Sequence, residues 1–506
     1  MYEAKYQKYI TKSNSRFSEP EEILAHARPL TNTFGKTASG IPLYYSSDET
    51  LYVDNEDNHT LVVGPTGCKK SRVTVFTTLA TIINAGESAV VNDPKGEIYR
   101  KTVWLAKKKG AKIMVLNFRK PLYSDSWNPL AEAYILHKLG KTDEAIQCVN
   151  DFVESVVEPA IQCTNDRYWG DTVKQFLTGV ILTYMDSVPP EYFNITNIMQ
   201  LCLEENSRYL KDILLNMDHT TTAAFGLHSV LDLEAEKTKS CVYSSLMAVM
   251  QPFTQNSGLM KMLSGDVVDF QSLSKKQSVI YLIYPDEKNN LSFLVNLFLT
   301  QCYETLVRTA FECEGDRLPL RVNFLLDEFS NLTPISNFDN RISEARSKNI
   351  RYFLFIQSFC QLKQKYKNNA ETIISNCNNW ICFSSTEMEF LEKISRICGN
   401  EVDYNGNEHP LLSPFDMQHF QKTDESVEVL IIKRGLYPFV TALPDYEYLS
   451  LFNNCKEESV NVINSNTNAK YITFEEWIRE MTFGKFRFPF PKNKASQTIN
   501  SFLFNL

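Results

Sequence analysis

A lysine–serine pair follows a glycine-containing turn early in the chain, and this order is typical of a loop that binds phosphate. The apolar run Thr60–Val63 leads into the turn, and a segment with helical spacing follows it. Such a turn aims backbone N–H groups at the phosphates, the lysine reaches the terminal phosphates and the serine hydroxyl is offered to Mg²⁺. The expected nucleotide-binding residues are Gly64, Pro65, Thr66, Gly67, Cys68, Lys69, Lys70 and Ser71.

One residue of this loop departs from the usual pattern G-x-x-x-x-G-K-[ST]. Lys69 stands where the second glycine is expected. A side chain at this position must point away from the phosphates or crowd them, because only glycine lacks a Cβ. The residues therefore predict a nucleotide loop whose rate of hydrolysis stays open.

Two adjacent acids form the second candidate group. The apolar stretch Val322–Leu326 reads as a buried strand, and it delivers Asp327 and Glu328 at its carboxyl end. In a nucleotide motor the first acid holds Mg²⁺ through water and the second polarises the attacking water. We therefore expect Lys70, Asp327 and Glu328 to be catalytic, and Ser71 and Asp327 to hold the metal.

Two further polar residues flank the next expected strand, Tyr352–Ile356. Gln357 follows this strand and could hydrogen-bond the γ-phosphate or the water, or else satisfy a loop carbonyl. Arg346 lies on the helix before the strand, where a guanidinium could neutralise transition-state charge on a neighbouring subunit. A surface ion pair is the alternative for Arg346. The charged turn Asp93–Glu97 likewise fits either a site loop or a solvated turn.

The elements that position these residues alternate between strands and helices, which predicts an α/β fold with a mostly parallel sheet. The expected strands are Leu61–Val63, Ala89–Val91, Ile113–Leu116, Val279–Tyr284, Val322–Leu326, Tyr352–Ile356, Trp380–Phe383 and Val429–Ile432. Between 131 and 265 only helical periodicity appears. The expected division is an N-terminal segment (1–59), an α/β domain in two parts (60–130 and 266–450), an inserted all-α domain (131–265) and a C-terminal tail (451–506).

Composition sets the broad class. The residues are 43% hydrophobic and 22% charged, a composition that is ordinary for folded domains. A chain of 506 residues is long enough for two or three such domains. A net charge of −8 limits any nucleic-acid contact to a local surface such as a pore. The twelve cysteines show no zinc spacing and indicate free thiols in a reducing compartment. No signal peptide and no run of about 18 apolar residues is seen, so we expect no membrane span.

Together these motifs resemble the type IV secretion coupling proteins, the TraG/TraD type of conjugal DNA-transfer ATPase. The resemblance covers roughly residues 40–445, with the helical insertion in the same place. It rests on the loop at 64–71 and on later motifs in the same order and spacing: Asp93–Glu97, Trp127–Leu130, Leu326–Phe329, Ala345–Ser347, Gln357–Leu362 and Ile394–Gly399.

This resemblance implies a RecA-like P-loop NTPase that binds ATP and Mg²⁺ and works as a homo-hexamer. It implies ATP-driven pumping of single-stranded DNA, with the relaxase joined to it, towards a type IV secretion channel. Gln357 takes the place of the nucleotide sensor and Arg346 that of the trans-acting arginine. Many relatives begin with two membrane helices. This chain shows none, so we expect a cytoplasmic protein held at the inner face of the membrane by partners.

Two other functions stay open on the residues alone. Lys69 is compatible with a docking module that binds substrates without hydrolysing nucleotide. A ring motor of the FtsK/HerA kind, acting on duplex DNA, shares the loop and the paired acids. The helical insertion and the Trp127–Leu130 loop favour the coupling protein over that motor.

Overall fold

The computed structural model describes residues 15–30, 37–161, 167–254, 256–265, 267–285, 291–402, 407–453, 455–460, 468–484 and 486–490. The chain divides into two compact units, each made of separate stretches of sequence. The first contains 1–115, 270–286 and 303–460, and the second contains 116–269, 287–302 and 461–506. The first unit carries both the loop at 64–71 and the acids at 327–328.

A nine-stranded sheet forms the centre of the first unit. Its strand order is β14-β13-β10-β4-β9-β8-β5-β7-β6. The strands from β10 to β7 pair in parallel, and β13 and β14 add an antiparallel edge. The bounds are β4 (His59–Val63), β5 (Ser88–Asn92), β6 (Lys112–Asn117), β7 (Ser278–Ile283), β8 (Val322–Leu326), β9 (Ile350–Ile356), β10 (Cys377–Cys382), β13 (Ser426–Lys433) and β14 (Phe439–Pro444).

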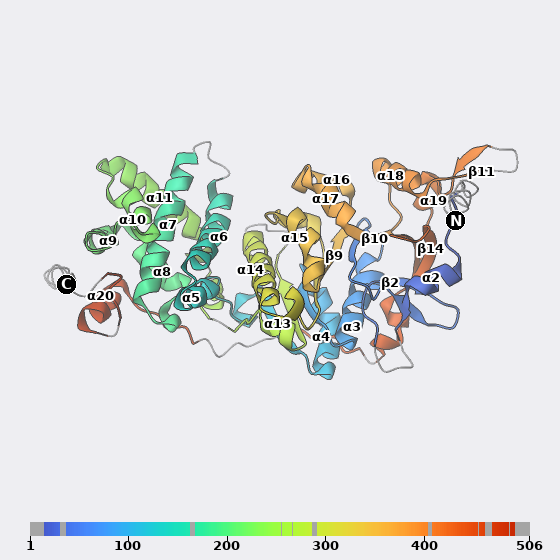
Figure 1. Ribbon diagram of the computed structural model, residues 1–506, viewed down its shortest axis with the longest axis horizontal. Coiled ribbons are helices and arrows are strands. Elements are labelled where there is room, and N and C mark those ends of the chain that lie inside the picture. Colours follow the sequence, from blue (N-terminus) through green and yellow to red (C-terminus); the bar gives the residue numbers. More distant parts are fainter. Residues whose placement is uncertain are drawn as a thin grey trace. The chain divides into compact units, whose positions relative to one another are not determined.

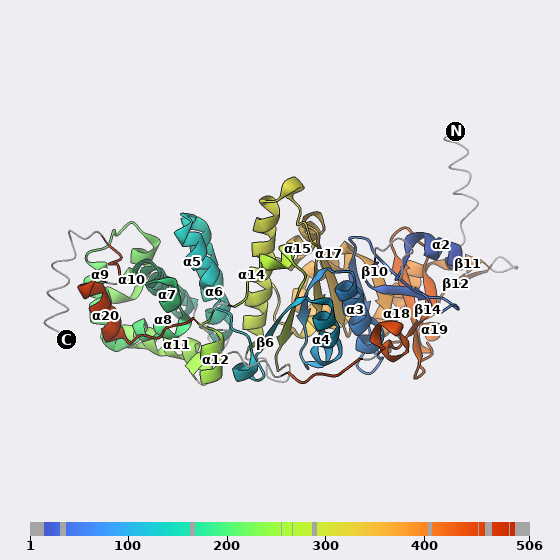
Figure 2. The same cartoon turned by 90° about the horizontal axis from the view of Figure 1, so that it is seen from below.

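Helices cover both faces of this sheet. Helices α3 (Phe76–Asn84) and α4 (Glu97–Lys109) pack together on one face, and α15 (Phe338–Ala345) and α17 (Asn369–Asn376) pack together on the other (Figures 1 and 2). Right-handed crossovers explain this arrangement. The connections through α3 and α4 run along the sheet from β4 towards β6, whereas those through α15 and α17 run in the opposite direction, from β8 towards β10. Strands β4, β5, β7, β8 and β9 are buried along their whole length, as strands covered on both faces must be.

The remaining elements of the first unit are short. They are α2 (Pro20–His26), the small sheet β1 (Arg28–Pro29), β3 (Leu51–Val53) and β2 (Pro42–Tyr45), α13 (Ser272–Lys275), α16 (Phe359–Tyr366), α18 (Met388–Cys398), the pair β11 (Asn400–Val402) and β12 (Glu408–Pro410), and α19 (Pro414–Gln418). Helix α14 (Ser292–Phe311) belongs partly to each unit.

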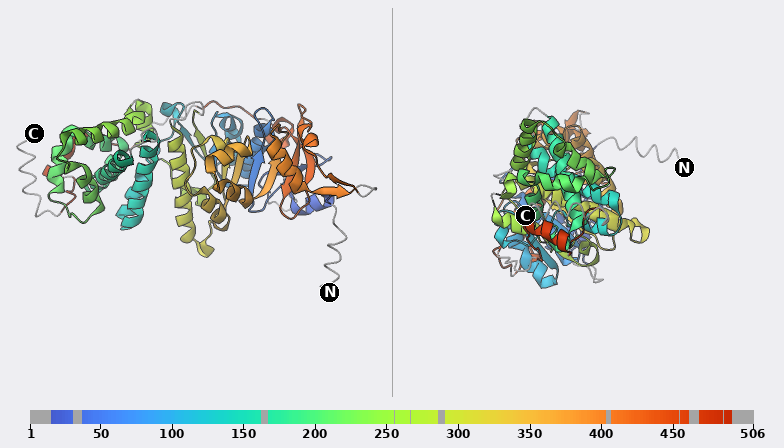
Figure 3. Two further views of the ribbon diagram at one scale, coloured as in Figure 1. Left: turned by 90° about the horizontal axis from the view of Figure 1, so that it is seen from above. Right: turned by 90° about the vertical axis from the view of Figure 1, so that its left-hand side faces the viewer.

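The described part of the second unit contains helices and no strand beyond the end of β6, and it includes the expected all-α segment 131–265 (Figure 3). Glycines allow two of its helices to touch, because a Cβ at Gly226 would lie 2.4 Å from the Gln175 carbonyl oxygen. Its helices are α5 (Ala131–Lys138), α6 (Thr142–Ile161), α7 (Arg167–Ser187), α8 (Ile195–Leu201), α9 (Ser207–Leu214), α10 (Thr222–Leu231), α11 (Glu236–Thr254), α12 (Ser257–Met262) and α20 (Phe474–Phe483).

The C-terminal helix α20 completes the second unit. Its Trp477 is fully buried, packs against the Tyr184 ring and donates from its indole nitrogen to Ser187 Oγ at 3.1 Å. The extended residues before the helix are held by Asn197, whose side chain donates to the Lys470 carbonyl at 2.9 Å. The expected tail 451–506 is therefore shared, with 451–460 in the first unit and 461–506 in the second.

His59 begins β4, the strand that delivers the phosphate loop, and it makes folding sensitive to acid. The residue is 3% exposed, Nδ1 accepts from the Tyr352 amide at 3.0 Å, and burial lowers the pKa of His59 from 6.5 to about 4. The unfolded chain therefore binds more protons between these values. We expect this group to lower the free energy of unfolding by about 3 kcal/mol as pH falls from 7 to 4.

Urea unfolding of the wild type and of His59→Asn at several pH values checks this. Asparagine keeps an acceptor for the Tyr352 amide but does not titrate, and both chains share every other titratable group. The free energy of unfolding of the wild type minus that of His59→Asn should fall by about 3 kcal/mol as pH falls from 7 to 4. Two curves that stay parallel would contradict the expected role of His59.

Candidate functional site

The phosphate loop joins β4 to helix α3 at the carboxyl edge of the sheet. The Gly64 amide donates to the Ile356 carbonyl of β9 at 3.1 Å, which ties the loop to the neighbouring strand. A Cβ at Gly64 would lie 2.9 Å from Phe383 Cβ, so no side chain fits there. Gly67 has φ +83°, a conformation that favours glycine. Both glycines are therefore required by the geometry of the loop.

Lys70 lies inside this loop. Its Nζ donates to the Gly64 carbonyl at 3.3 Å and to the Ile356 carbonyl at 3.1 Å, and the residue is 6% exposed. The ammonium thus sits beside the carboxyl end of β9, next to Gln357. A phosphate entering the loop would meet a positive charge that is already desolvated and oriented.

The helix after the loop begins differently from the regular α-helix that its spacing predicts. Residues Ser71–Val75 form one turn of π-helix, η1, before α3 starts at Phe76. The Thr74 hydroxyl donates to the Lys70 carbonyl at 2.6 Å, and the Phe76 amide bonds the Ser71 carbonyl five residues back. A hydroxyl that competes for a backbone carbonyl loosens the helical ladder in this way. Single π-turns of this kind are frequent at functional sites.

Asp327 follows β8 and is buried beside the loop. Burial raises the pKa of Asp327 to about 7; the Lys70 charge opposes this rise, and the carboxylates of Glu328 and Asp93 add to it. Its backbone is fixed by Asn92, the last residue of β5, whose side-chain amide donates to the Asp327 carbonyl at 2.6 Å. A buried carboxyl with so little local compensation is suited to a cation.

Asp93 is the second buried acid of the site. It is 1% exposed, its carboxylate accepts from the Tyr99 amide at 2.7 Å, and burial raises the pKa of Asp93 to about 6. Within the turn Asp93–Glu97, Lys95 and Glu97 are exposed. The solvated-turn alternative is therefore wrong for Asp93, because the turn folds this one carboxylate back under the start of α4.

A small cavity of ≈ 30 Å³ collects these groups. Its polar lining includes Ser71, Asp93, Asp327 and Glu328. The volume suits a water or a small ion. No cluster of three or more His, Cys, Asp or Glu side chains in the described residues is arranged to hold a metal alone. That fits Mg²⁺, which is held by one or two carboxylates together with water and substrate phosphates.

Glu328 and Gln357 are joined directly. Gln357 Nε2 donates to Glu328 Oε2 at 2.7 Å, and Glu328 takes the left-handed backbone conformation with φ +51°. A non-glycine residue in this conformation is held by its surroundings at some cost, a situation typical of functional positions. Gln357 therefore contacts a candidate catalytic side chain directly, and the alternative of an amide that only satisfies a loop carbonyl does not describe it.

Arg346 is the one candidate that the fold does not bring to this edge. It lies in the turn η8 (Arg346–Lys348) at the amino end of β9, whereas the loop at 64–71 follows the carboxyl end of the parallel strand β4. Seven residues of β9 separate the two edges, roughly 23 Å. The side chain is exposed, and among the described residues it has no ion-pair partner. The surface ion pair considered above is therefore absent there.

The sequence argument missed Asn92, and it left Asp93 open between a site loop and a solvated turn. Asn92 and Asp93 follow β5, which pairs directly with β8, so strand adjacency places them beside Asp327. Their polar character at a strand end was visible in the sequence. The order of strands in the sheet was not, because non-consecutive strands are neighbours here.

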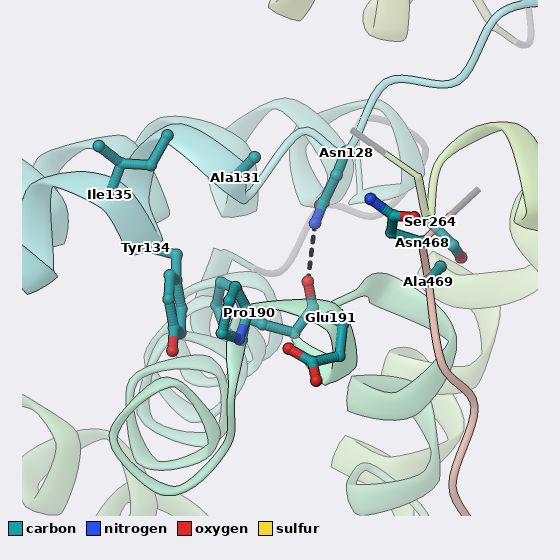
Figure 4. A pocket seen from close by; sticks show the side chains of 10 residues that line it. Asn128, Ala131, Tyr134, Ile135, Pro190, Glu191, Ser264, Asn468 and Ala469 are labelled. Carbon is teal, nitrogen blue, oxygen red and sulfur yellow. Dashed lines mark hydrogen bonds between the residues drawn. The ribbon is translucent and has the colours of Figure 1, made fainter. Parts of the chain in front are cut away.

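A larger cavity lies apart from these residues, within the second unit. Its volume is ≈ 290 Å³, and Tyr134 and Ile135 of α5 face Pro190 and Glu191 across it (Figure 4). Asn128 Nδ2 donates to the Phe193 carbonyl at 2.7 Å. None of the expected site residues lines this cavity.

A phosphate loop and a strand ending in two acids, set at one edge of a largely parallel sheet, define a RecA-like P-loop NTPase fold, as expected. Solved structures agree on the fold. The unbound bacterial conjugative coupling protein TrwBΔN70 matches at a TM-score of 0.55 and 16% identity, over 86% of this chain and 92% of that chain. TrwB with ADP and Mg²⁺ matches at 0.56 and 15%, over 89% and 97%.

The family follows from the sequence. The family model for type IV secretory system conjugative DNA transfer matches residues 15–406, most of the chain. The chain therefore belongs to this family of coupling proteins, as its motifs predict. No curated protein matches it. Among the described residues, no helix is both long and apolar enough to cross a bilayer.

Proposed function

We propose that this protein is an ATP-driven coupling protein that recruits relaxase-bound single-stranded DNA and delivers it to a type IV secretion channel. The observation that carries the proposal is the convergence of Lys70 and Ser71 with Asp327 and Glu328 at one edge of the sheet. Phosphoryl transfer needs these two halves together, because the enzyme acts mainly by positioning and by neutralising charge.

The roles of the residues follow from their places. Lys70 and the loop amides bind the phosphates, and Ser71 and Asp327 would hold Mg²⁺, which neutralises phosphate charge when bound. Glu328 polarises the attacking water and accepts its proton. Gln357, hydrogen-bonded to Glu328, can exchange this contact for a γ-phosphate oxygen and so report the nucleotide state along β9.

The choice of ATP and Mg²⁺ is supported by relatives. TrwB was solved with the non-hydrolysable ATP analogue ADPNP, at 15% identity to this chain, and also with ADP and Mg²⁺. The buried carboxyls Asp93 and Asp327 suit a cation in this chain. We propose that Asp93 supports the metal site from beside Asp327.

The position of Arg346 supports assembly into a ring. Its exposed guanidinium lies at the edge opposite the loop of its own subunit, so any action on phosphate must reach a neighbouring subunit. We propose a homo-hexamer in which each Arg346 completes the next site. We further propose that partners hold this assembly at the inner face of the cytoplasmic membrane, where the secretion channel opens.

Steady-state ATP hydrolysis with and without DNA tests the proposal. The wild type should hydrolyse ATP, and single-stranded DNA should raise the rate. Lys70→Ala removes the buried ammonium from the loop and should abolish both nucleotide binding and turnover. Lys108→Met is a matched control, since Lys108 is an exposed lysine of α4 far along the helix from the loop.

Three outcomes count against the proposal. Turnover that survives Lys70→Ala would place hydrolysis elsewhere. Relaxase binding without any ATP binding would favour the docking module. Stimulation by duplex DNA in preference to single strands would favour a motor of the FtsK/HerA kind.

A further inference from the structure

The backbone at Lys69 has the conformation that the missing glycine would supply. Lys69 has φ +65°, and the Arg72 and Val73 amides donate to its carbonyl at 3.0 and 3.1 Å. A side chain in the left-handed region is strained relative to glycine, so something must hold it there. The loop therefore places a lysine in a conformation that glycine adopts without strain.

The Lys69 side chain leaves the loop and ends in a set of three oxygen atoms. Its Nζ donates to the carbonyls of Thr423 and Asp424 at 2.9 and 3.0 Å, and it lies 3.6 Å from Asp445 Oδ2. Two of the three N–H donors of the ammonium therefore have carbonyl acceptors, and the Asp445 carboxylate forms an ion pair with it. Only 17% of the side chain is exposed. Lys69 is thus turned away from the space that phosphate would occupy.

A second lysine makes the opposite connection. Lys422, in the segment between α19 and β13, donates from Nζ to the Gly67 carbonyl at 2.6 Å. Lys69 of the loop thus donates to carbonyls of this segment, and Lys422 of this segment donates to a carbonyl of the loop. A third contact supports both, because Arg72 at the start of η1 pairs with the buried Asp445 through two hydrogen bonds of 2.5 and 2.8 Å.

The acceptor segment is itself well ordered by hydrogen bonds. The Thr423 amide donates to the Ser426 carbonyl at 2.9 Å, and the Ser426 amide donates to Thr423 Oγ1 at 3.0 Å. The Asp445 amide donates to the Glu425 carbonyl at 2.7 Å. These bonds fix the two carbonyls that Lys69 reaches, so the site for its ammonium exists independently of Lys69.

From these contacts we infer that Lys69 is a positioning residue, which replaces the loop glycine by anchoring a left-handed lysine to the carbonyls of Thr423 and Asp424. Together with Lys422 on Gly67, it holds the loop in the conformation that accepts phosphate. The inference rests on the proposed ATP site. It makes the 422–424 segment part of nucleotide binding although it contributes no group to the phosphates.

Four variants separate the anchor from the backbone strain. Lys69→Met keeps the length of the side chain and loses the ammonium, so the left-handed conformation is no longer held. Lys69→Gly also loses the anchor but adopts φ +65° freely. Lys422→Met removes the contact to Gly67, and Lys108→Met is the control on an exposed lysine. Fluorescence titration with an ATP analogue, the KM and kcat of hydrolysis, and thermal unfolding are measured for each.

Lys69→Met should weaken analogue binding and raise KM on the order of tenfold, because only a fraction of loops is then competent to bind. Lys69→Gly should recover most of that loss, and Lys422→Met should be weakened in the same sense. The kcat should stay within about threefold, because neither lysine touches the reacting atoms. Lys108→Met should match the wild type.

The inference fails if Lys69→Met and Lys422→Met bind the analogue as tightly as the wild type, or if Lys69→Gly is as weak as Lys69→Met. If Lys69→Met does not fold, the comparison of Lys69→Gly with Lys422→Met still decides. Lys69→Gly should then bind the analogue more tightly than Lys422→Met, and equal affinities would contradict the inference. A wild type that binds no ATP would instead overturn the proposed function. The two failures are therefore distinguishable.

Discussion

Replacing Glu328 by glutamine should lower ATP turnover by about 10²–10⁴-fold while nucleotide still binds. Glutamine has the same shape and can still accept the hydrogen bond that Gln357 donates at 2.7 Å. It cannot take a proton from the attacking water. The loss should therefore appear in kcat, with the affinity for an ATP analogue changed by no more than a few-fold.

Asp327→Asn is the matched comparison for this experiment. Asp327 is buried and is proposed to hold the metal, so its loss should weaken the Mg²⁺-dependent part of nucleotide binding as well as the rate. A Glu328→Gln protein whose kcat stays within tenfold of the wild type would remove Glu328 from the catalytic step.

Arg346→Ala should lower hydrolysis by about 10³–10⁵-fold if its guanidinium completes a neighbouring site. The expected size is large because transition-state charge would lose a cation in a desolvated interface. The fold of each subunit should be unaffected, since the side chain is exposed and has no ion-pair partner among the described residues. Turnover and assembled mass with nucleotide bound are the measurements.

Mixing two inactive proteins tests the trans arrangement directly. Arg346→Ala subunits keep an intact phosphate loop, and Lys70→Ala subunits keep an intact Arg346. If the guanidinium acts across subunits, mixed assemblies should regain a fraction of wild-type turnover that depends on the mixing ratio. If every mixture is as inactive as Arg346→Ala alone, Arg346 does not act in trans.

The sequence predicted the strands of the central sheet well because each has a simple cause. Apolar runs such as Leu61–Val63 and Val322–Leu326 are buried on both faces, so they need no alternation and stand out from the polar turns. The polar residue types at the ends of these runs then indicated the edge of the sheet where we propose the site. The loop at 64–71 and Asp327 were found in this way.

Other features depend on contacts between distant segments, which no local pattern contains. Asp93 reads as part of a charged turn, and only the pairing of β5 with β8 brings it beside Asp327. The tolerance for Lys69 depends on carbonyls more than 350 positions later in the chain. The π-turn at Ser71–Val75 accompanies a hydrogen bond from the Thr74 hydroxyl to the Lys70 carbonyl, and helical spacing in the sequence does not predict this bond.

The second unit is assembled from stretches that lie far apart in the sequence. Trp477 of α20 fills its interior against Tyr184 of α7. During synthesis the helices of the middle segment therefore emerge long before the residues that cover them. Their apolar surface stays uncovered until α20 has been synthesised, which is a state that chaperones recognise. Expression at low temperature or with added chaperones should accordingly favour recovery of the intact chain.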